Sequence, residues 1–353
     1  MNRQSNRARA RACFQRPVPF NVVAVALCFA AAGCSEDADD DEGFIAGDSG
    51  SIEVLAEGFD VPTTVALRGG TAWVPQGQFN ALLSMGMTAP TLPFEVSSVS
   101  VDGGLGSATI ELPGDDFYPE GITAAPNGDL YVGSVFTGEI VKVPAGSTSA
   151  AVFAPVGVLE RGALGLLVDE ERELLWVCDS NLGANRPGGA LVGLSLSQAE
   201  EQVRHELPAA TFCNDILLER DGDILFTETF TGRVYRVASD DALTDDSAQV
   251  YIADATIEPP MPGAFGANGL ALVGGRLFVA VTSKGTLVRF DLSAADPAST
   301  ASVVELSEGS ESDVPLSGPD GIIRLSDSEL LVVENGFALP NEERLIKITF
   351  DPE

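Results

Sequence analysis

Short apolar runs alternate with polar turns along most of the chain. Residues 118–143 show the pattern clearly, with two runs of alternating apolar residues on either side of a Pro-Asn-Gly-Asp turn. Alternation with a period of two, bounded by Gly, Asn and Asp, is typical of β-hairpins. Helical periodicity is nearly absent, and only the stretch around 195–203 has room for a turn or two. The pattern therefore predicts an all-β protein.

The hairpin at 118–143 recurs, with drift, in six copies along the chain. The copies begin near Val61, Tyr118, Ala163, Cys213, Ala267 and Pro319. Their second strands are marked by Trp73, Tyr131, Trp176, Phe226, Phe278 and Val332, which are 45 to 58 residues apart. This spacing is typical of a four-stranded propeller blade. We therefore predict a six-bladed β-propeller with about four antiparallel strands per blade around a central channel. A β-sandwich would not explain the near-equal spacing.

Equivalent positions on the innermost strands of a propeller meet at its axis, so the copies can be compared at one register. In chain order that register holds Thr63, Glu120, Leu164, Asn214, Asn268 and Asp320. Carboxylate and amide oxygens are the ligands that a hard cation such as Ca²⁺ prefers. We therefore predict that four of these residues bind Ca²⁺ or another divalent cation: Glu120, Asn214, Asn268 and Asp320. The alternative is turn chemistry, since Asn-Gly and Asp-Gly are common turn sequences.

The N-terminus has the features of an export signal. Residues 1–33 contain five arginines and no acid, followed by an apolar run that is short for a membrane span. The run ends in Ala-Ala-Gly before Cys34, which resembles a bacterial lipobox with Ala31 in place of the usual Leu. We predict a lipoprotein signal peptide at 1–33, lipidation of Cys34 and an acidic tether at 34–50, which leaves the propeller at 51–353. The protein would then be a lipoprotein of the bacterial cell envelope, facing the periplasm or the cell surface. Plain secretion is the alternative.

The charge of the chain limits its partners. It carries 52 acidic against 20 basic residues, a formal net charge of −32. A surface this acidic disfavours nucleic acid and anionic membranes, so membrane contact is expected only through the anchor at Cys34. We expect a monomer that binds a small molecule.

Cysteine and histidine usage limits the metal chemistry. Beyond the leader and Cys34, Cys178 and Cys213 could pair in an oxidising compartment or stay as two buried thiols. His205 is the single histidine, so no Cys or His cluster suits zinc. We expect His205 to lie on the surface, at the outer edge of a blade.

Several motifs carry a family resemblance. "YPEGITAAPNGDLYVGS", "FCNDILLERDGDILFTET", "ANGLAL" and "GPDGIIRL" resemble the senescence marker protein/gluconolactonase/luciferin-regenerating enzyme family. Its wider superfamily of six-bladed propellers includes diisopropylfluorophosphatase, the paraoxonases and strictosidine synthase. The resemblance runs from about Ser51 to the C-terminus. One departure is a complete copy at 61–77 ahead of the copy that bears Glu120, which implies a shifted closure of the ring.

The resemblance implies a calcium ion in the channel, held by Glu120, Asn214, Asn268 and Asp320. It also implies hydrolysis of a lactone or a phosphotriester-like ester, with Asp320 as base or nucleophile. A paraoxonase-type His-His dyad cannot exist with one histidine, and no arginine matches those that bind sugar acids in gluconolactonases.

Two functions remain open at this point. The first is an exported, lipid-anchored, Ca²⁺-dependent hydrolase of lactones or related esters. The second is a non-catalytic propeller in which a structural calcium lies near a mouth that binds a ligand or a protein. The ends of the second strands give further candidates for the channel lining: Gln76, Ser134, Asp179, Glu228, Thr282 and Glu334. Candidate partners for an anionic substrate are Arg161, Arg186 and Lys284.

Overall fold

A computed structural model describes residues 44–84, 87–181, 188–336 and 342–353. The predicted leader, Cys34 and most of the predicted tether lie outside the described residues. The described chain is almost entirely β-structure. Its helices are α1 (Phe79–Leu83) and three short 3₁₀ segments at Ser239–Asp241, Thr282–Lys284 and Pro297–Thr300.

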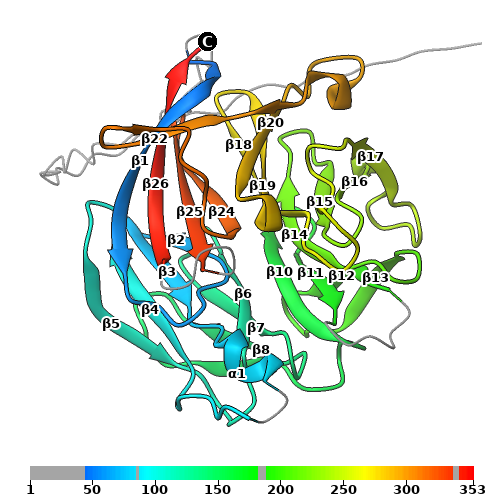
Figure 1. The fold of residues 1–353 in the computed structure, drawn as a ribbon. Helices are drawn as coiled ribbons and strands as arrows, with labels where there is room; N and C mark the ends of the chain where they lie inside the picture. The colour runs from blue at the N-terminus through cyan, green and yellow to red at the C-terminus, as the bar shows by residue number, and fades with distance from the viewer. Residues whose placement is uncertain (1–43, 85–86, 182–187, 337–341) are drawn as a thin grey trace, which may run out of the picture. The chain divides into compact units, whose positions relative to one another are not determined.

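The strands form six sheets, which are the six blades of the predicted propeller (Figure 1). Blade 1 comprises β2 (Ala66–Arg68), β3 (Thr71–Pro75), β4 (Glu95–Ser100) and β5 (Leu105–Glu111). Blade 2 comprises β6 (Pro119–Ala124), β7 (Leu130–Ser134), β8 (Ile140–Val143) and β9 (Ala151–Ala154). Blade 3 comprises β10 (Gly162–Asp169), β11 (Leu174–Ser180), β12 (Ala190–Ser195) and β13 (Glu201–Glu206).

Blades 4 and 5 repeat the same up-and-down order. Blade 4 comprises β14 (Cys213–Leu218), β15 (Ile224–Glu228), β16 (Arg233–Val237) and β17 (Gln249–Ala253). Blade 5 comprises β18 (Ala267–Val273), β19 (Arg276–Val281), β20 (Thr286–Phe290) and β21 (Ser302–Val303). The first strand of each blade packs against the first strand of the next, so β6, β10, β14, β18 and β24 (Pro319–Ser326, in blade 6) follow one another around the channel.

Blade 6 joins the two ends of the described chain. Its sheet has the order β23-β22-β1-β26-β25-β24, in which β1 is Ala46–Glu57 and β22 and β23 are Glu305–Glu308 and Glu311–Ser312. The remaining strands are β24 (Pro319–Ser326), β25 (Glu329–Asn335) and β26 (Glu343–Pro352). Figure 1 shows β1 beside β26, and the two pair antiparallel. The N-terminal strand thus closes the ring at blade 6, which leaves blade 1 as a complete copy ahead of Glu120. β1 also begins at Ala46, inside the segment predicted as tether.

The hydrophobic core lies between neighbouring blades. Tyr131 of blade 2 belongs to the same buried cluster as Leu175 of blade 3, and Leu225 of blade 4 clusters with Val279 of blade 5. Every residue of β11 is buried, because a middle strand is packed on both faces. Each fully buried Leu or Val stabilises the fold by about 1.5–3 kcal/mol relative to an exposed one. This packing holds the innermost strands in fixed register around the channel.

Candidate metal centre in the channel

The four predicted ligands meet in one place. Glu120 is on β6, Asn214 on β14, Asn268 on β18 and Asp320 on β24, and each is at most 6% exposed. All four line the same cavity, which has about 450 Å³ of space free of protein atoms, counting the part open to solvent. They also line a smaller cavity of about 250 Å³ together with Thr63, which occupies the same register in blade 1. We call these four residues the ligand ring.

In most copies the residue directly after the ring position is glycine, because the innermost strands of neighbouring blades approach each other closely there. A Cβ at Gly121 would lie 1.9 Å from the carbonyl oxygen of Leu164, and one at Gly269 would lie 2.3 Å from that of Asp320. Real Cβ atoms never approach backbone that closely, so only glycine fits. The Glu-Gly, Asn-Gly and Asp-Gly pairs are therefore sites of interblade contact on strands. The turn interpretation of these sequences is wrong at this register.

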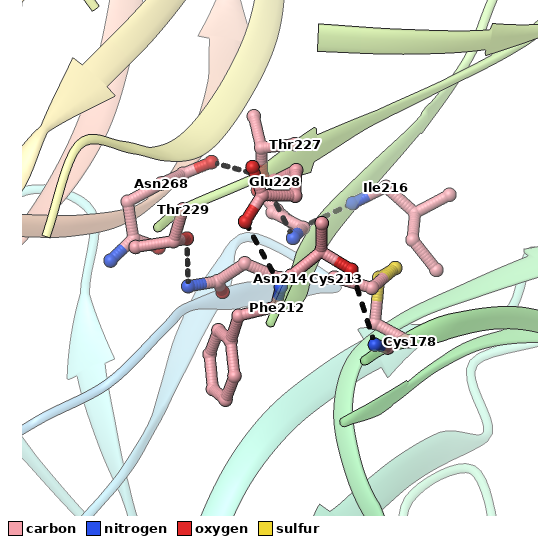
Figure 2. The surroundings of a disulfide bond; sticks show 12 residues. Cys178, Phe212, Cys213, Asn214, Ile216, Thr227, Glu228, Thr229 and Asn268 are labelled. Atoms are coloured by element: carbon pink, nitrogen blue, oxygen red, sulfur yellow. Dashed lines mark hydrogen bonds between the residues drawn. A yellow bond between two sulfur atoms is a disulfide. The ribbon is translucent and has the colours of Figure 1, made fainter. Parts of the chain in front are cut away.

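Hydrogen bonds to two threonines orient the ring asparagines. Asn214 Nδ2 donates to Thr229 Oγ1 at 3.0 Å, and Asn268 Nδ2 donates to Thr282 Oγ1 at 2.8 Å. The two hydroxyls donate in turn to backbone carbonyls, at 2.7 Å and 2.9 Å. Figure 2 shows the bond from Asn214 to Thr229. Because each hydroxyl proton is already committed, each asparagine must present its NH₂ to the threonine and turn its amide oxygen away from it.

The amide oxygen of Asn268 lacks a partner. Among the described residues, Asn268 Oδ1 is buried and accepts no hydrogen bond. An unpaired buried oxygen costs about 1–3 kcal/mol, so native proteins rarely leave one without a bound group. The donor set of the ring consists of two carboxylates and two amides, which matches the oxygen chemistry of Ca²⁺ sites. The residues present therefore fit a divalent cation.

The electrostatics of the ring favour the same occupant. Burial raises the pKa of Glu120 well above its ordinary value, and the nearby Asp320 and Asp215 raise it further. Burial also raises the pKa of Asp320 to about 7, although side-chain hydrogen bonds from Asn335 and Asn268 oppose the rise. Asn335 Nδ2 donates to Asp320 Oδ2 at 2.9 Å. Neighbouring buried carboxylates repel one another. A divalent cation between them would offset both this repulsion and the cost of removing the two charges from water.

Asp215 is a third carboxylate at the hub that the sequence comparison missed. It follows Asn214 at the position where four other copies have glycine. Its carboxylate accepts hydrogen bonds from the backbone N–H groups of Ile216 at 2.9 Å and Leu270 at 3.0 Å. Burial raises the pKa of Asp215 to about 7. The sequence did contain a signal for Asp215, namely an acidic residue at a position where most copies have glycine. The signal was missed because Asn-Asp is also a common pair in ordinary loops.

The predicted lining positions at the ends of the second strands mostly do not line the channel. Asp179 and Glu228 are fully buried and accept hydrogen bonds from the backbone N–H groups of Arg161 and Phe212, at 2.8 Å and 3.0 Å. Three other members also form hydrogen bonds to the backbone. Gln76 accepts from Asp60 N–H, Glu334 accepts from Ser317 N–H, and Ser134 donates to the Phe117 carbonyl. These side chains hold the entry to each innermost strand. Of the six, only Thr282 also lines the cavity above the ring.

Two of the candidate partners for an anionic substrate are engaged elsewhere. The Arg161 guanidinium is buried and pairs with Asp179 and Glu206. Lys284 Nζ donates to the backbone carbonyls of Ala255 and Thr256. Neither lines the cavity above the ring. Arg186 lies outside the described residues.

His205 is buried, so the prediction of a surface histidine was wrong. It lies on β13, the outermost strand of blade 3, but its side chain is 0% exposed. Nε2 donates to the Ala242 carbonyl at 3.1 Å, and Nδ1 accepts from Ser247 N–H at 3.3 Å. The loop between β16 and β17 of the next blade therefore covers the imidazole of His205. Sequence spacing could not show this contact across 37 to 42 residues.

Cys178 and Cys213 form a disulfide, with Cα atoms 5.1 Å apart. The bond joins β11 of blade 3 to β14 of blade 4, and Figure 2 shows it next to Asn214. The alternative of two free thiols is therefore excluded.

A separate acidic cluster lies on the turn between β14 and β15. Glu219, Asp221 and Asp223 lie close enough for their oxygens to share one ion. Asp223 already binds Arg236 and the backbone N–H of Ser239. This cluster is not part of the ligand ring.

The helices can be checked for a membrane-spanning segment. Within the ranges that the structure describes, none of the helices has the length and hydropathy needed to span a bilayer.

No protein-family model matches the chain, and no curated protein matches its sequence. Solved structures do match. Regucalcin from Agrobacterium tumefaciens, a calcium-binding protein, is 15% identical with a TM-score of 0.58, covering 87% of this chain and 98% of its own. Luciferin-regenerating enzyme is 13% identical with a TM-score of 0.58, covering 85% and 95%. Streptogramin B lyase is 15% identical with a TM-score of 0.54, covering 85% and 97%.

These identities are low, so the likeness concerns the fold. It agrees with the family resemblance read from the motifs. The chain is a six-bladed β-propeller whose fold is similar to those of regucalcin and luciferin-regenerating enzyme.

Proposed function

We propose that this protein is a Ca²⁺-dependent hydrolase of lactones or related esters. The observation that carries the proposal is the buried ligand ring of Glu120, Asn214, Asn268 and Asp320 at the floor of an open cavity. Asn268 Oδ1, which has no partner within the described ranges, supports a cation there. A bound Ca²⁺ would supply Lewis-acid polarisation of a carbonyl or phosphoryl oxygen.

Asp320 is the catalytic residue of this proposal. Its Oδ2 accepts a hydrogen bond from Asn335 Nδ2 at 2.9 Å, which fixes the plane of the carboxylate. The carboxylate lines the cavity, where it could take a proton from water or attack an ester carbon. Burial raises the pKa of Asp320 in the metal-free ring, and a bound cation would favour the ionised carboxylate that a base or nucleophile requires.

Asp215 would act through the ring and would not contact substrate. Two backbone N–H groups hold its carboxylate, and it lines the smaller cavity but not the larger one. Its negative charge would strengthen the attraction of the ring for a cation.

We further propose that the protein is exported and anchored through a lipid on Cys34. The Arg-rich leader with its apolar run supports export, and the Cys178–Cys213 disulfide is expected of an oxidising compartment. Plain secretion is the alternative. A formal charge of −32 supports a monomer that contacts the membrane only through its anchor and does not bind nucleic acid.

A non-catalytic propeller with a structural calcium is the second candidate. It is favoured by the lack of a histidine near the ring, since His205 is buried in the outer part of blade 3. In that case the cavity would bind a ligand or protein partner without turnover.

The test combines metal binding with turnover. The protein is stripped with a chelator, titrated with Ca²⁺ by calorimetry, and assayed on a panel of lactones and aryl esters. Asp320→Asn should abolish calcium-dependent turnover. Asp240→Asn, the same exchange at an exposed residue of blade 4, should behave as the parent. Calcium binding without turnover on the whole panel would favour the second candidate, and absence of calcium binding would overturn both.

A further inference from the structure

The cavity above the ligand ring has apolar walls. Its apolar side chains come from α1, from β10 and from three loops: Phe79, Leu83, Val135, Leu164, Phe212 and Phe265. Leu164 occupies the ring register of blade 3, so one sector of the hub itself is hydrocarbon. A ligand held at the ring oxygens would therefore have aliphatic and aromatic surface beside it.

One wall is aromatic and well supported. Phe212 packs on Phe230 with ring centroids 5.0 Å apart, and Phe230 packs on Phe265 at 6.1 Å. Figure 2 shows Phe212 beside Asn214, so this wall begins at the ring. Phe212 is only 3% exposed. Such packed aromatics form a rigid surface for another apolar group.

The charges of the cavity disfavour anions. Among the described residues that line it, the charged ones are Glu120 and Asp320, and there is no Lys, Arg or His. Arg161 and Lys284 are held by other partners, as described above. The whole chain carries a formal charge of −32. A Ca²⁺ ion in the ligand ring would balance these two carboxylates, so an anionic substrate would find no side-chain counter-ion among these residues and would be repelled by the negative charge of the whole chain.

Several donors that line the cavity are already engaged within the protein, which leaves fewer hydrogen bonds for the hydroxyls of a ligand. Asn214 and Asn268 donate to threonines, and Asn335 donates to Asp320. Thr282 donates its proton to the Pro319 carbonyl. A sugar lactone would exchange the hydrogen bonds of its several hydroxyls with water for apolar contacts, which is unfavourable.

We propose that the cavity takes a neutral lactone or ester with an aliphatic or aromatic substituent, in preference to a sugar lactone or an anionic ester. This inference rests on the proposed function for its reaction but on the cavity walls for its ligand class. The substituent would lie against Leu83, Leu164 and Phe212 while the ester group faces the ring.

The first test is a homologous series. Calcium-loaded protein is assayed on γ-lactones with alkyl chains of increasing length, on glucono-δ-lactone and on an aryl ester bearing a carboxylate. The kcat/KM should rise roughly fourfold per methylene until the cavity is filled, the factor that corresponds to one buried CH₂. Equal or higher kcat/KM for the sugar lactone or the anionic ester would overturn the inference while leaving the hydrolase proposal intact.

A matched pair of variants locates the effect. Leu83→Asn places an amide in the cavity wall at a residue that is 50% exposed, so the fold should tolerate it. It should lower the ratio of kcat/KM for the longest over the shortest lactone about fivefold. Leu243→Asn makes the same exchange at a residue of blade 4 that is 64% exposed and outside the cavity, and it should keep the parental ratio. Equal ratios in the two variants would overturn the inference.

A binding experiment separates the ligand class from the reaction. Lactams with the same alkyl chains resist hydrolysis, and their affinity is measured by calorimetry with Ca²⁺ present. Affinity that rises with chain length and falls in Leu83→Asn supports the inference even if no lactone is turned over, in which case the hydrolase proposal fails alone. Affinity that does not depend on chain length overturns the inference.

Discussion

Asn268 donates its side-chain N–H to Thr282 Oγ1 at 2.8 Å, and its own Oδ1 is buried without a partner among the described residues. Asn268 lies on β18, the first strand of blade 5, and Thr282 begins the 3₁₀ turn that follows the second strand, β19. The threonine hydroxyl donates onward to the Pro319 carbonyl of blade 6. This chain of bonds decides which end of the amide faces the hub, and it links a ring ligand to the backbone that carries Asp320.

Thr282→Val should therefore weaken calcium binding. The exchange keeps the shape of the side chain but removes the acceptor that orients Asn268, and loss of an outer partner typically costs about 10- to 100-fold in metal affinity. Calorimetric titration with Ca²⁺ measures the effect. Thr286→Val is the control, because the hydroxyl of Thr286 in the same blade is buried and has no hydrogen-bond partner in the part of the chain that the structure describes. Unchanged affinity in Thr282→Val would contradict the orienting role.

Gly269→Ala should destabilise the propeller strongly. The new Cβ would lie 2.3 Å from the Asp320 carbonyl oxygen, so the innermost strands of blades 5 and 6 would have to separate. We expect a loss of about 3 kcal/mol or more, at the upper end for overpacking. Gly146→Ala is the comparison, since it has open space around it and positive φ, and should cost about 1 kcal/mol. Urea unfolding of both variants measures the difference, and similar losses would contradict the close-approach argument.

Buried His205 should make stability depend on pH below neutrality. Burial lowers the pKa of His205, so the unfolded chain binds a proton more readily than the folded one. Its contribution is therefore fully present above the unfolded pKa of about 6.5 and is lost as pH falls towards the folded value. Between pH 7.5 and 5.5 the parent should lose about 1 kcal/mol more than His205→Asn, as measured by urea unfolding. An equal loss in both proteins would show that this histidine does not titrate differently on unfolding.

The Cys178–Cys213 disulfide should stabilise the fold and also strengthen Ca²⁺ binding by the ligand ring. Cys178 and Cys213 close a loop of 35 residues, for which chain entropy gives about 4 kcal/mol. Cys213 also precedes Asn214 directly, so the double variant Cys178→Ala/Cys213→Ala should bind Ca²⁺ more weakly as well as unfold at lower urea. Reductant should lower the stability of the parent and leave that of the double variant unchanged. Parental stability in the double variant would contradict this assignment.

The repeat and its register could be predicted because both are local features of the chain. Each blade is a succession of neighbouring strands, so alternation and turn residues mark its hairpins without reference to distant segments. Glu120, Asn214, Asn268 and Asp320 each stand at the same point of their copies, and the symmetry of a propeller converts equal register into proximity. Fold class, blade number and the grouping of these four residues followed from that relation.

Contacts between blades required the structure, because they join residues whose separation in the chain has no period. Asp215 and the glycines of the ring register are explained only by the approach of the next innermost strand. The ends of the second strands turned out to bind backbone, since Asp179 and Glu228 face the entry of their own blade. His205 is covered by a loop of the following blade.

The sequence by itself thus determined a six-bladed propeller and the four oxygen-bearing residues at its hub, since local strand patterning and a repeated register specify them. Tertiary structure alone decided how those residues are oriented and what surrounds them. Thr229 and Thr282 direct the amides, and Phe212 and Leu164 supply apolar wall. The physical reason is that hydrogen bonds and packing between blades depend on side chains brought together by closure of the ring, which no local pattern records.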